Sequence, residues 1–179
     1  MKTGRNIEIK AKQNSPAAQN ALARALADRA PETLNQVDTF FNALSGRLKL
    51  REFGDGNGEL IAYLRPDTTE PTCSKYSIYR TSTPEDLKET LEQSLGVMGV
   101  VTKTRQLLMF EQTRIHLDEV EGLGHFVELE VVLRPDQPED EGTVIARDLM
   151  QKLQIREEDL TASAYIDMLM HRLMTNPSS

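Results

Sequence analysis

The chain has 179 residues, of which 39% are hydrophobic and 27% are charged, the balance expected of one soluble globular domain rather than a disordered or membrane-spanning chain. Its formal net charge is −7. That sign argues against a general binder of nucleic acids or anionic membranes, because both need a basic surface to neutralise phosphates. Any site for an anion must therefore be local.

The cysteine content and the N-terminus indicate where the protein resides. Cys73 is the only cysteine, so no internal disulfide can form, and no Cys/His spacing fits a structural zinc site. The chain begins with a charged alternating segment, without the apolar region of a secretion signal and without a run long enough to span a bilayer. We therefore expect a cytoplasmic protein, with neither a membrane nor a nucleic acid as partner.

The first third of the chain predicts strands around one helix. Residues 5–12 alternate polar and apolar side chains, as in a half-buried strand, and Ser15-Pro16 then begins a helix. From about Asn35 to Pro66 the period of two returns in runs separated by glycine-containing turns, at 36–41, 47–53 and 60–65. These runs predict a β-meander.

The rest of the chain predicts a second helix, more strands and a helical end. Residues 71–74 have the composition of a turn, and Thr83-Pro84 begins a helix. Three alternating runs follow, at 100–110, 113–119 and 126–133. Two helical stretches come last, near residues 138–153 and 157–173. The fold class is therefore α+β, with an antiparallel sheet in the middle of the chain.

The predicted strands share an apolar face and a charged face. The apolar positions form a surface on which helices can pack: Ile7, Ile9, Leu48, Leu50, Leu60, Leu64, Ile115, Leu117, Val127, Leu129 and Val131. The opposite positions carry nine basic and four acidic side chains: Lys10, Lys12, Arg47, Lys49, Arg51, Arg65, Lys103, Arg105 and Arg114, with Glu8, Asp118, Glu128 and Glu130. Asn6, Tyr63 and His116 lie on this charged face too.

Clustering of like charges on one face needs an explanation, because Arg47, Lys49 and Arg51 repel one another and an isolated surface sheet gains nothing from them. A bound polyanion accounts for it. If the sheet curls into a barrel, the charged face becomes the lumen, where charges must be paired, hydrated or matched to a ligand. Guanidinium and ammonium groups suit phosphate oxygens, and carboxylates suit a Mg²⁺ or Mn²⁺ ion that bridges the same phosphates.

Short motifs make this pattern more specific. Asn6-x-Glu8-x-Lys10 comes first, and four motifs follow in order: Lys49-x-Arg51, Lys103-x-Arg105, Ile115-His116-Leu117-Asp118 and Phe126-Val127-Glu128-Leu129-Glu130. From roughly Asn6 to Leu133 they resemble the CYTH, or triphosphate tunnel metalloenzyme, family, whose N-terminal signature is Glu-x-Glu-x-Lys. The resemblance implies an eight-stranded antiparallel β-barrel with flanking helices, formed by a single domain over residues 1–179 with its core at about 5–173.

The resemblance also implies roles for the charged residues. Metal ligands for Mg²⁺ or Mn²⁺ would be Glu8, Asp118, Glu128 and Glu130, and catalytic residues would be Glu8, Lys10, Asp118 and Glu130. Phosphate ligands would be Lys10, Lys12, Arg47, Lys49, Arg51, Arg65, Lys103, Arg105 and Arg114, with a solvated rim position as the alternative for Lys12 and Arg47. Asn6 departs from the signature, because an amide replaces its first glutamate and brings no charge to a metal site. His116 and His125 have no second His or Cys at ligand spacing, which favours structural roles.

These expectations lead to a hydrolytic function. The basic residues and the metal would neutralise a bound triphosphate while a carboxylate or the metal orients the attacking water. The chain would then be a metal-dependent triphosphatase acting on tripolyphosphate or on a nucleoside or thiamine triphosphate. Two alternatives stay open: a class IV adenylyl cyclase that forms cyclic AMP from ATP, and a non-catalytic module that binds polyphosphate or nucleotides. The expected partner is a small triphosphate, and a homodimer is left open.

Overall fold

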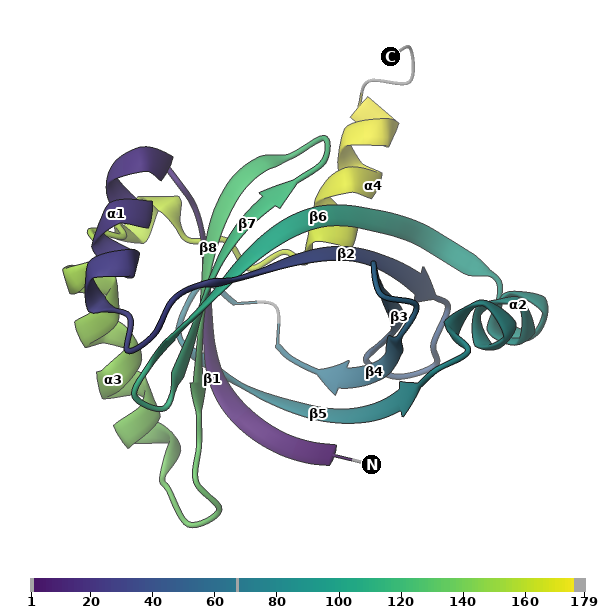
Figure 1. Cartoon of the computed structure of the whole chain (residues 1–179), viewed down its shortest axis with the longest axis horizontal. Helices are drawn as coiled ribbons and strands as arrows, with labels where there is room; N and C mark the ends of the chain where they lie inside the picture. Colours follow the sequence, from purple (N-terminus) through teal and green to yellow (C-terminus); the bar gives the residue numbers. More distant parts are fainter. Residues whose placement is uncertain (1, 67, 176–179) are drawn as a thin grey trace.

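Eight antiparallel strands close into a barrel in the computed structural model, which describes residues 2–66 and 68–175 (Figure 1). The strands are β1 (Lys2–Lys12), β2 (Glu32–Phe41), β3 (Arg47–Phe53), β4 (Gly58–Leu64), β5 (Thr72–Thr81), β6 (Val97–Phe110), β7 (Thr113–Val120) and β8 (Gly124–Val132). Their order around the barrel is β1-β5-β4-β3-β2-β6-β7-β8, and β8 pairs with β1 to close it. The predicted α+β class and antiparallel barrel are confirmed.

The described part of the chain also holds four α-helices: α1 (Pro16–Leu26), α2 (Pro84–Leu95), α3 (Glu139–Lys152) and α4 (Tyr165–Thr175). Helices α1 and α3 lie on one side of the barrel and α2 lies on the opposite side (Figure 1). Helix α4 packs beside β6. None of the helices within residues 2–66 and 68–175 combines the length and the apolar character that a membrane crossing requires.

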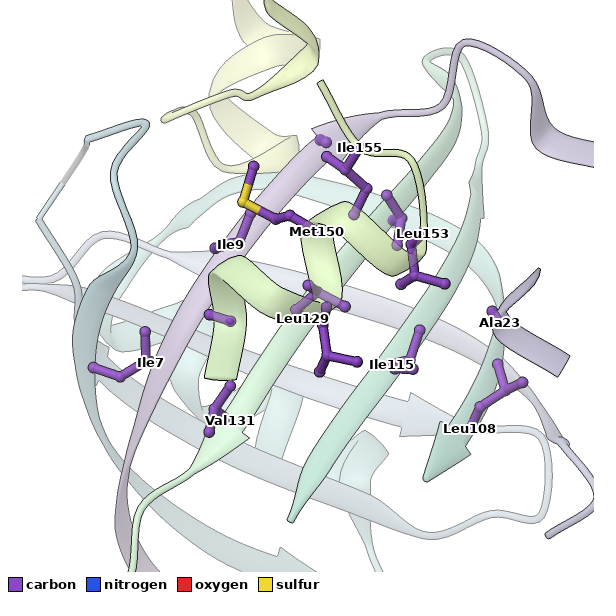
Figure 2. Close-up of a cluster of buried hydrophobic side chains, with 14 of the residues drawn as sticks. Ile7, Ile9, Ala23, Leu108, Ile115, Leu129, Val131, Met150, Leu153 and Ile155 are labelled. Carbon is purple, nitrogen blue, oxygen red and sulfur yellow. The ribbon is translucent and has the colours of Figure 1, made fainter. Parts of the chain in front are cut away.

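The main hydrophobic core lies outside the barrel, between the sheet and helices α1 and α3. Ile7 and Ile9 of β1 point outward, as do Leu129 and Val131 of the neighbouring strand β8 (Figure 2). They pack against the buried face of α3, in which Leu149 is fully buried. Because side chains alternate along a strand, the charged neighbours of these residues point into the barrel.

The side of the barrel formed by β4 and β5 has an outer face exposed to solvent, and two sequence predictions were wrong there. Residues 71–74, predicted as a turn, contain the start of β5, with Cys73 on its outer face. The strand signal is weak because outward side chains of β5, such as Tyr79 at 57% exposed, face solvent. Leu64, predicted to lie under a helix, is 54% exposed for the same reason.

The C-terminal helices confirm one prediction and correct another. Helix α3 occupies most of the predicted stretch 138–153. The predicted helix 157–173 is wrong over its first half, which forms a short 3₁₀ turn at Glu157–Asp159 and then an extended segment before α4 begins at Tyr165. The extended segment is held by β1, because the Thr161 N–H donates to the carbonyl of Lys10 at 2.9 Å. This contact places residues 162–165 at one end of the barrel.

Gly142 lies where α3 packs tightly against the sheet. A Cβ at this position would lie 2.6 Å from Leu133 Cδ2 and 2.7 Å from Ile7 Cγ1. Alanine usually stabilises a helix by about 1 kcal/mol relative to glycine. We nevertheless expect Gly142→Ala to lower the free energy of unfolding by about 1–3 kcal/mol, because the core must shift to admit the methyl group.

Urea denaturation measures this change. Gly54→Ala is the matched control, since no atom lies within 4 Å of the Cβ that it adds. If Gly142→Ala were as stable as the wild type or more so, the packing of α3 described above would be wrong.

Candidate functional site

The inward side chains of the strands line a cavity of about 250 Å³ inside the barrel. The predicted charged residues that line it are Glu8, Lys10, Lys49, Arg51, Arg65, Lys103, Arg105, Arg114, Glu128 and Glu130. Three predicted residues lie elsewhere. Lys12 is exposed at the end of β1, Arg47 donates to Asp167 of α4 at 2.8 Å, and Asp118 is buried behind Arg105.

One wall of the cavity is a cationic cluster built around Asp38 of β2. The Asp38 carboxylate accepts hydrogen bonds from Lys49 at 2.8 Å, from Arg51 at 2.7 and 2.8 Å, and from Lys103 at 2.7 Å. Burial acts to raise the pKa of Asp38, but Arg51, Lys103 and Lys49 outweigh it and hold that pKa well below its usual range. For Lys103 burial dominates and lowers the pKa to about 7. One carboxylate stands against three cations, so this wall can accept further anions.

Arg105 is held by two other carboxylates, those of Asp118 and Glu128. Its guanidinium donates to Asp118 at 2.6 and 2.5 Å and to Glu128 at 2.9 Å. The phenol of Tyr165, at the start of α4, donates to Asp118 at 2.9 Å. Burial, followed by the charge of Asp118, raises the pKa of Tyr165 well above its ordinary value, so the phenol keeps its proton. Both oxygens of Asp118 are thus engaged by protein donors, and its role as a metal ligand stays a prediction.

The opposite wall is acidic. His116 of β7 and Glu128 and Glu130 of β8 each place one ligand atom so that the three atoms lie within 4.8 Å of one another. Within residues 2–66 and 68–175 this is the one group of three or more His, Cys, Asp or Glu side chains whose ligand atoms come this close together. Glu8 of β1 is the direct cross-strand neighbour of Glu130. The structure therefore adds His116, for which the sequence favoured a structural role, to the predicted acidic set.

These donors fit a divalent cation. The Nδ1 of His116 lies 3.5 Å from Glu128 Oε2 and 3.7 Å from Glu130 Oε1, and it makes no well-aligned hydrogen bond. Burial, and then Arg105, lowers the pKa of His116, which favours the neutral ring that binds metals. Glu128 and Glu130 already have protein partners, because Arg105 donates to the former at 2.9 Å and Arg114 lies 2.9 Å from the latter. A cation placed here would share these carboxylates with the two arginines.

The segment before α4 fills one end of the barrel. Arg65 donates to the carbonyl of Ala162 at 2.6 Å and Lys10 donates to the carbonyl of Ser163 at 3.5 Å, while Lys10 Nζ lies 4.3 Å from the centre of the Tyr165 ring. A second apolar cluster surrounds these contacts, formed by Phe40, Val101, Val120, Phe126, Ala164, Tyr165 and Ile166. The cavity is therefore blocked by packed side chains at the α4 end and must be entered from the other end.

Asp38 and Tyr165 are site residues to which the sequence analysis gave no role. Asp38 lies in the run predicted as a strand at 36–41, and extending the alternation along that run would have placed Gln36, Asp38 and Phe40 in the lumen. The position of Tyr165 depends on a tertiary contact, since its partner Asp118 is 47 residues away in the chain. No local pattern could have indicated that contact.

We expect Asp38→Asn to destabilise the protein strongly. The change removes the negative charge shared by three buried cations, and breaking a buried ion pair typically costs about 3–5 kcal/mol. Added tripolyphosphate should raise the melting temperature of the variant more than that of the wild type, because the anion replaces the missing charge. Thermal unfolding with and without the anion measures both effects.

The control for Asp38 is Glu52→Gln, which breaks a partly exposed pair with Lys88 at 2.9 Å on the outside of the barrel and should cost less than about 1 kcal/mol. Equal losses in the two variants would contradict the central role of Asp38. So would an anion response no larger in Asp38→Asn than in the wild type.

Glu8 should make the metal-free protein less stable as the pH rises. Burial, and then the charges of Glu130 and Glu128, raise its pKa from 4.5 to about 7. Between these pH values the folded chain keeps a proton that the unfolded chain releases, so the free energy of unfolding falls by about 1.4 kcal/mol for each unit of pKa shift. Glu8→Gln cannot ionise, so its melting temperature relative to the wild type should rise from pH 5 to pH 8 in the presence of chelator.

Glu119→Gln, on the exposed outer face of β7, controls for the loss of a carboxylate and should show no such trend. A difference between Glu8→Gln and the wild type that does not change with pH would show that Glu8 ionises normally.

Comparisons with known proteins agree with this geometry. The PH1012 protein from Pyrococcus horikoshii OT3 has a TM-score of 0.80 and 24% identity, covering 90% of this chain and 98% of that chain. A candidate adenylate cyclase from Vibrio parahaemolyticus has a TM-score of 0.71 and 19% identity, covering 93% and 98%. At these identities the likeness shows the fold alone, and no curated protein matches the sequence. The family model of the CYTH domain matches residues 4–165, and the chain therefore belongs to the CYTH domain family.

Proposed function

We propose that the chain is a metal-dependent triphosphatase that hydrolyses a triphosphate bound inside its barrel. The observation that carries the proposal is the pairing of two walls of opposite charge in one buried cavity, with Lys49, Arg51 and Lys103 facing Glu8, Glu128 and Glu130. A site for an anion alone has no use for carboxylates, which repel phosphates. The CYTH family binds triphosphates and includes triphosphatases and adenylate cyclases.

The acidic wall would hold the metal ion. Glu128, Glu130 and His116 are the closest set, with Glu8 as a further carboxylate. When bound, the ion would supply positive charge that offsets the charge of the phosphates. His116 contributes a nitrogen donor, which Mg²⁺ uses less readily than oxygen, so we expect Mn²⁺ to support more activity than Mg²⁺. Asn6 lines the same cavity with a buried, unpartnered Oδ1 that can contact the water shell of such an ion.

The cationic wall would bind the phosphate chain. Arg51, Lys49 and Lys103 present guanidinium and ammonium donors to the cavity and would exchange part of their pairing with Asp38 for phosphate oxygens. Lys10 lies 3.6 Å from Glu128 and can stabilise charge on the departing phosphate. Glu8 is the cross-strand neighbour of Glu130 and would accept a proton from the attacking water.

A class IV adenylyl cyclase is the second candidate. It is supported by the structural likeness to the candidate cyclase from Vibrio parahaemolyticus. The cationic wall could bind the triphosphate in either reaction. In that reaction the ribose 3′-hydroxyl of ATP would attack the α-phosphate in place of water and release pyrophosphate. A non-catalytic module that binds polyphosphate would keep the cationic wall and form no product.

A product assay separates these functions. The purified protein is incubated with tripolyphosphate, ATP or thiamine triphosphate, each with Mg²⁺, Mn²⁺ or chelator, and phosphate, pyrophosphate and cyclic AMP are measured. We expect phosphate release that requires a metal ion. Cyclic AMP with pyrophosphate would make the protein a cyclase, and binding without turnover would make it a polyphosphate-binding module.

Glu130→Ala should lower metal-dependent turnover by more than about 100-fold, because it removes a carboxylate from the closest metal-binding set. Lys49→Ala, on the other wall, should chiefly raise KM. Glu119→Ala is the control, since it removes a carboxylate from the exposed outer face of β7. Circular dichroism checks that each variant is folded, and unchanged turnover in a folded Glu130→Ala protein would remove Glu130 from the site.

A further inference from the structure

Two arginines lie against the carboxylates of the acidic wall, and they are held differently. Arg105 donates to both oxygens of Asp118 and to Glu128, and its side chain is 6% exposed. The Nε of Arg114 lies 2.9 Å from Glu130 Oε2 but makes no well-aligned hydrogen bond, and the side chain of Arg114 is 24% exposed. Arg105 is therefore fixed in place, whereas Arg114 is attracted to Glu130 by charge and keeps more freedom to move.

Tyr76 of β5 orients Arg114 from another strand. The Arg114 guanidinium donates a hydrogen bond to the Tyr76 hydroxyl. To reach it, the phenol crosses β1 at Gly4, its direct cross-strand partner. A Cβ at Gly4 would lie 2.7 Å from Tyr76 Cζ and closer still to the hydroxyl oxygen, so glycine leaves the room that the phenol needs here. Gly4 and Tyr76 together therefore determine where the guanidinium lies.

Arg114 lies where its charge opposes a bound metal ion. Its direct cross-strand partner is Glu130, whose partner on the other side is Glu8. Glu130 also belongs to the closest metal-binding set, with Glu128 and His116. Two positive charges at such short range repel each other strongly. An ion that binds Glu130 must therefore displace Arg114 or tolerate its charge, unless Arg114 has another anion to contact.

A bound phosphate chain would be that other anion. Arg114 lines the same cavity as the cationic wall, and guanidinium groups pair well with phosphate oxygens. Its greater exposure compared with Arg105 leaves it free to exchange one partner for the other.

We infer that Arg114, positioned by Tyr76, weakens metal binding at Glu130 until a phosphate chain is present. The inference rests on the proposed function, because it takes the acidic wall to hold the metal ion and the cavity to hold the phosphates. Without phosphate, Arg114 supplies the positive charge beside Glu130. When phosphate oxygens enter, Arg114 pairs with them and Glu130 becomes available to the ion. The ion and the phosphate chain therefore bind together, and Tyr76 is a positioning residue that acts through Arg114.

Calorimetric titration of the phosphate-free protein with Mn²⁺ tests the inference. Arg114→Gln should lower the Kd for Mn²⁺ at least about tenfold, because the opposing charge is gone. Arg114→Lys keeps that charge and should stay within about threefold of the wild type. Tyr76→Phe should lower the Kd about threefold, because Arg114 loses the hydrogen bond that holds it. In the Arg114→Gln background, Tyr76→Phe should have no further effect.

Two control variants match these changes on the outside of the barrel. Arg147→Gln, on α3, removes an exposed arginine that lies 2.6 Å from Glu70. Tyr79→Phe removes a hydroxyl from the outer face of β5, where Tyr79 is 57% exposed. Neither should change the Kd for Mn²⁺. In a second titration, with tripolyphosphate in the presence of chelator, Arg114→Gln should bind about tenfold more weakly than the wild type. Damage to the fold would weaken the binding of both ligands, so opposite shifts exclude it.

Failure of this inference can be told apart from failure of the proposed function. Unchanged or weaker Mn²⁺ binding by Arg114→Gln overturns the inference, while the product assay decides independently whether the protein is a triphosphatase. An effect of Tyr76→Phe that persists in the double variant overturns the role of Tyr76. If neither the wild type nor Arg114→Gln binds Mn²⁺, the metal site itself is wrong and both proposals fail. Tighter binding by Arg114→Gln without turnover of any triphosphate supports the inference although the protein is not a triphosphatase.

Discussion

Burial of charge inside the barrel is the constraint on which the rest of the structure depends. A charged side chain taken out of water costs several kcal/mol unless a partner compensates it. Asp38 and Asp118 are such partners, since each accepts two hydrogen bonds from an arginine and at least one more from another side chain. The apolar residues of the same strands face outward, where α1 and α3 cover part of them. The alternation that builds the hydrophobic core therefore also concentrates the charge in the lumen.

The C-terminal segment makes the two ends of the barrel different, because it fills one of them. Carbonyl oxygens of Ala162 and Ser163 accept hydrogen bonds from Arg65 and Lys10. These two cations also lie 3.6 Å from Glu8 and Glu128, so the segment ties the α4 end of the barrel to the acidic wall. Tyr165 reaches into the same end and fixes Asp118, which in turn fixes Arg105. A short stretch far from the strands in sequence thus closes one end and orders both walls. Because this end is filled, the way into the cavity lies at the other end.

Strand periodicity made much of the fold and site predictable from the sequence. Where one face of a strand packs under a helix, as at Ile7 and Leu129, the alternation is clear and the strand was predicted. It is weak in β5, whose outer face meets solvent, so the alternation predicted seven strands and the family resemblance indicated the eighth. The partners of Asp38 were harder to foresee, because β2 pairs with β6 and joins Asp38 to Lys103 across 65 residues. His116 was underrated for a similar reason, since its carboxylate neighbours lie on another strand.

Glu8 and Lys103 depart from normal ionisation in opposite directions for the same reason. Burial is the largest cause in both, raising the pKa of Glu8 and lowering that of Lys103, each to about 7. Each group therefore titrates near neutral pH in a cavity without a ligand, and an additional opposite charge favours its charged form. Under the proposed function, a bound metal ion would favour the charged form of Glu8, and a bound phosphate chain would favour the charged form of Lys103. Because the two ligands also attract each other across a cavity of about 250 Å³, binding of either one favours binding of the other.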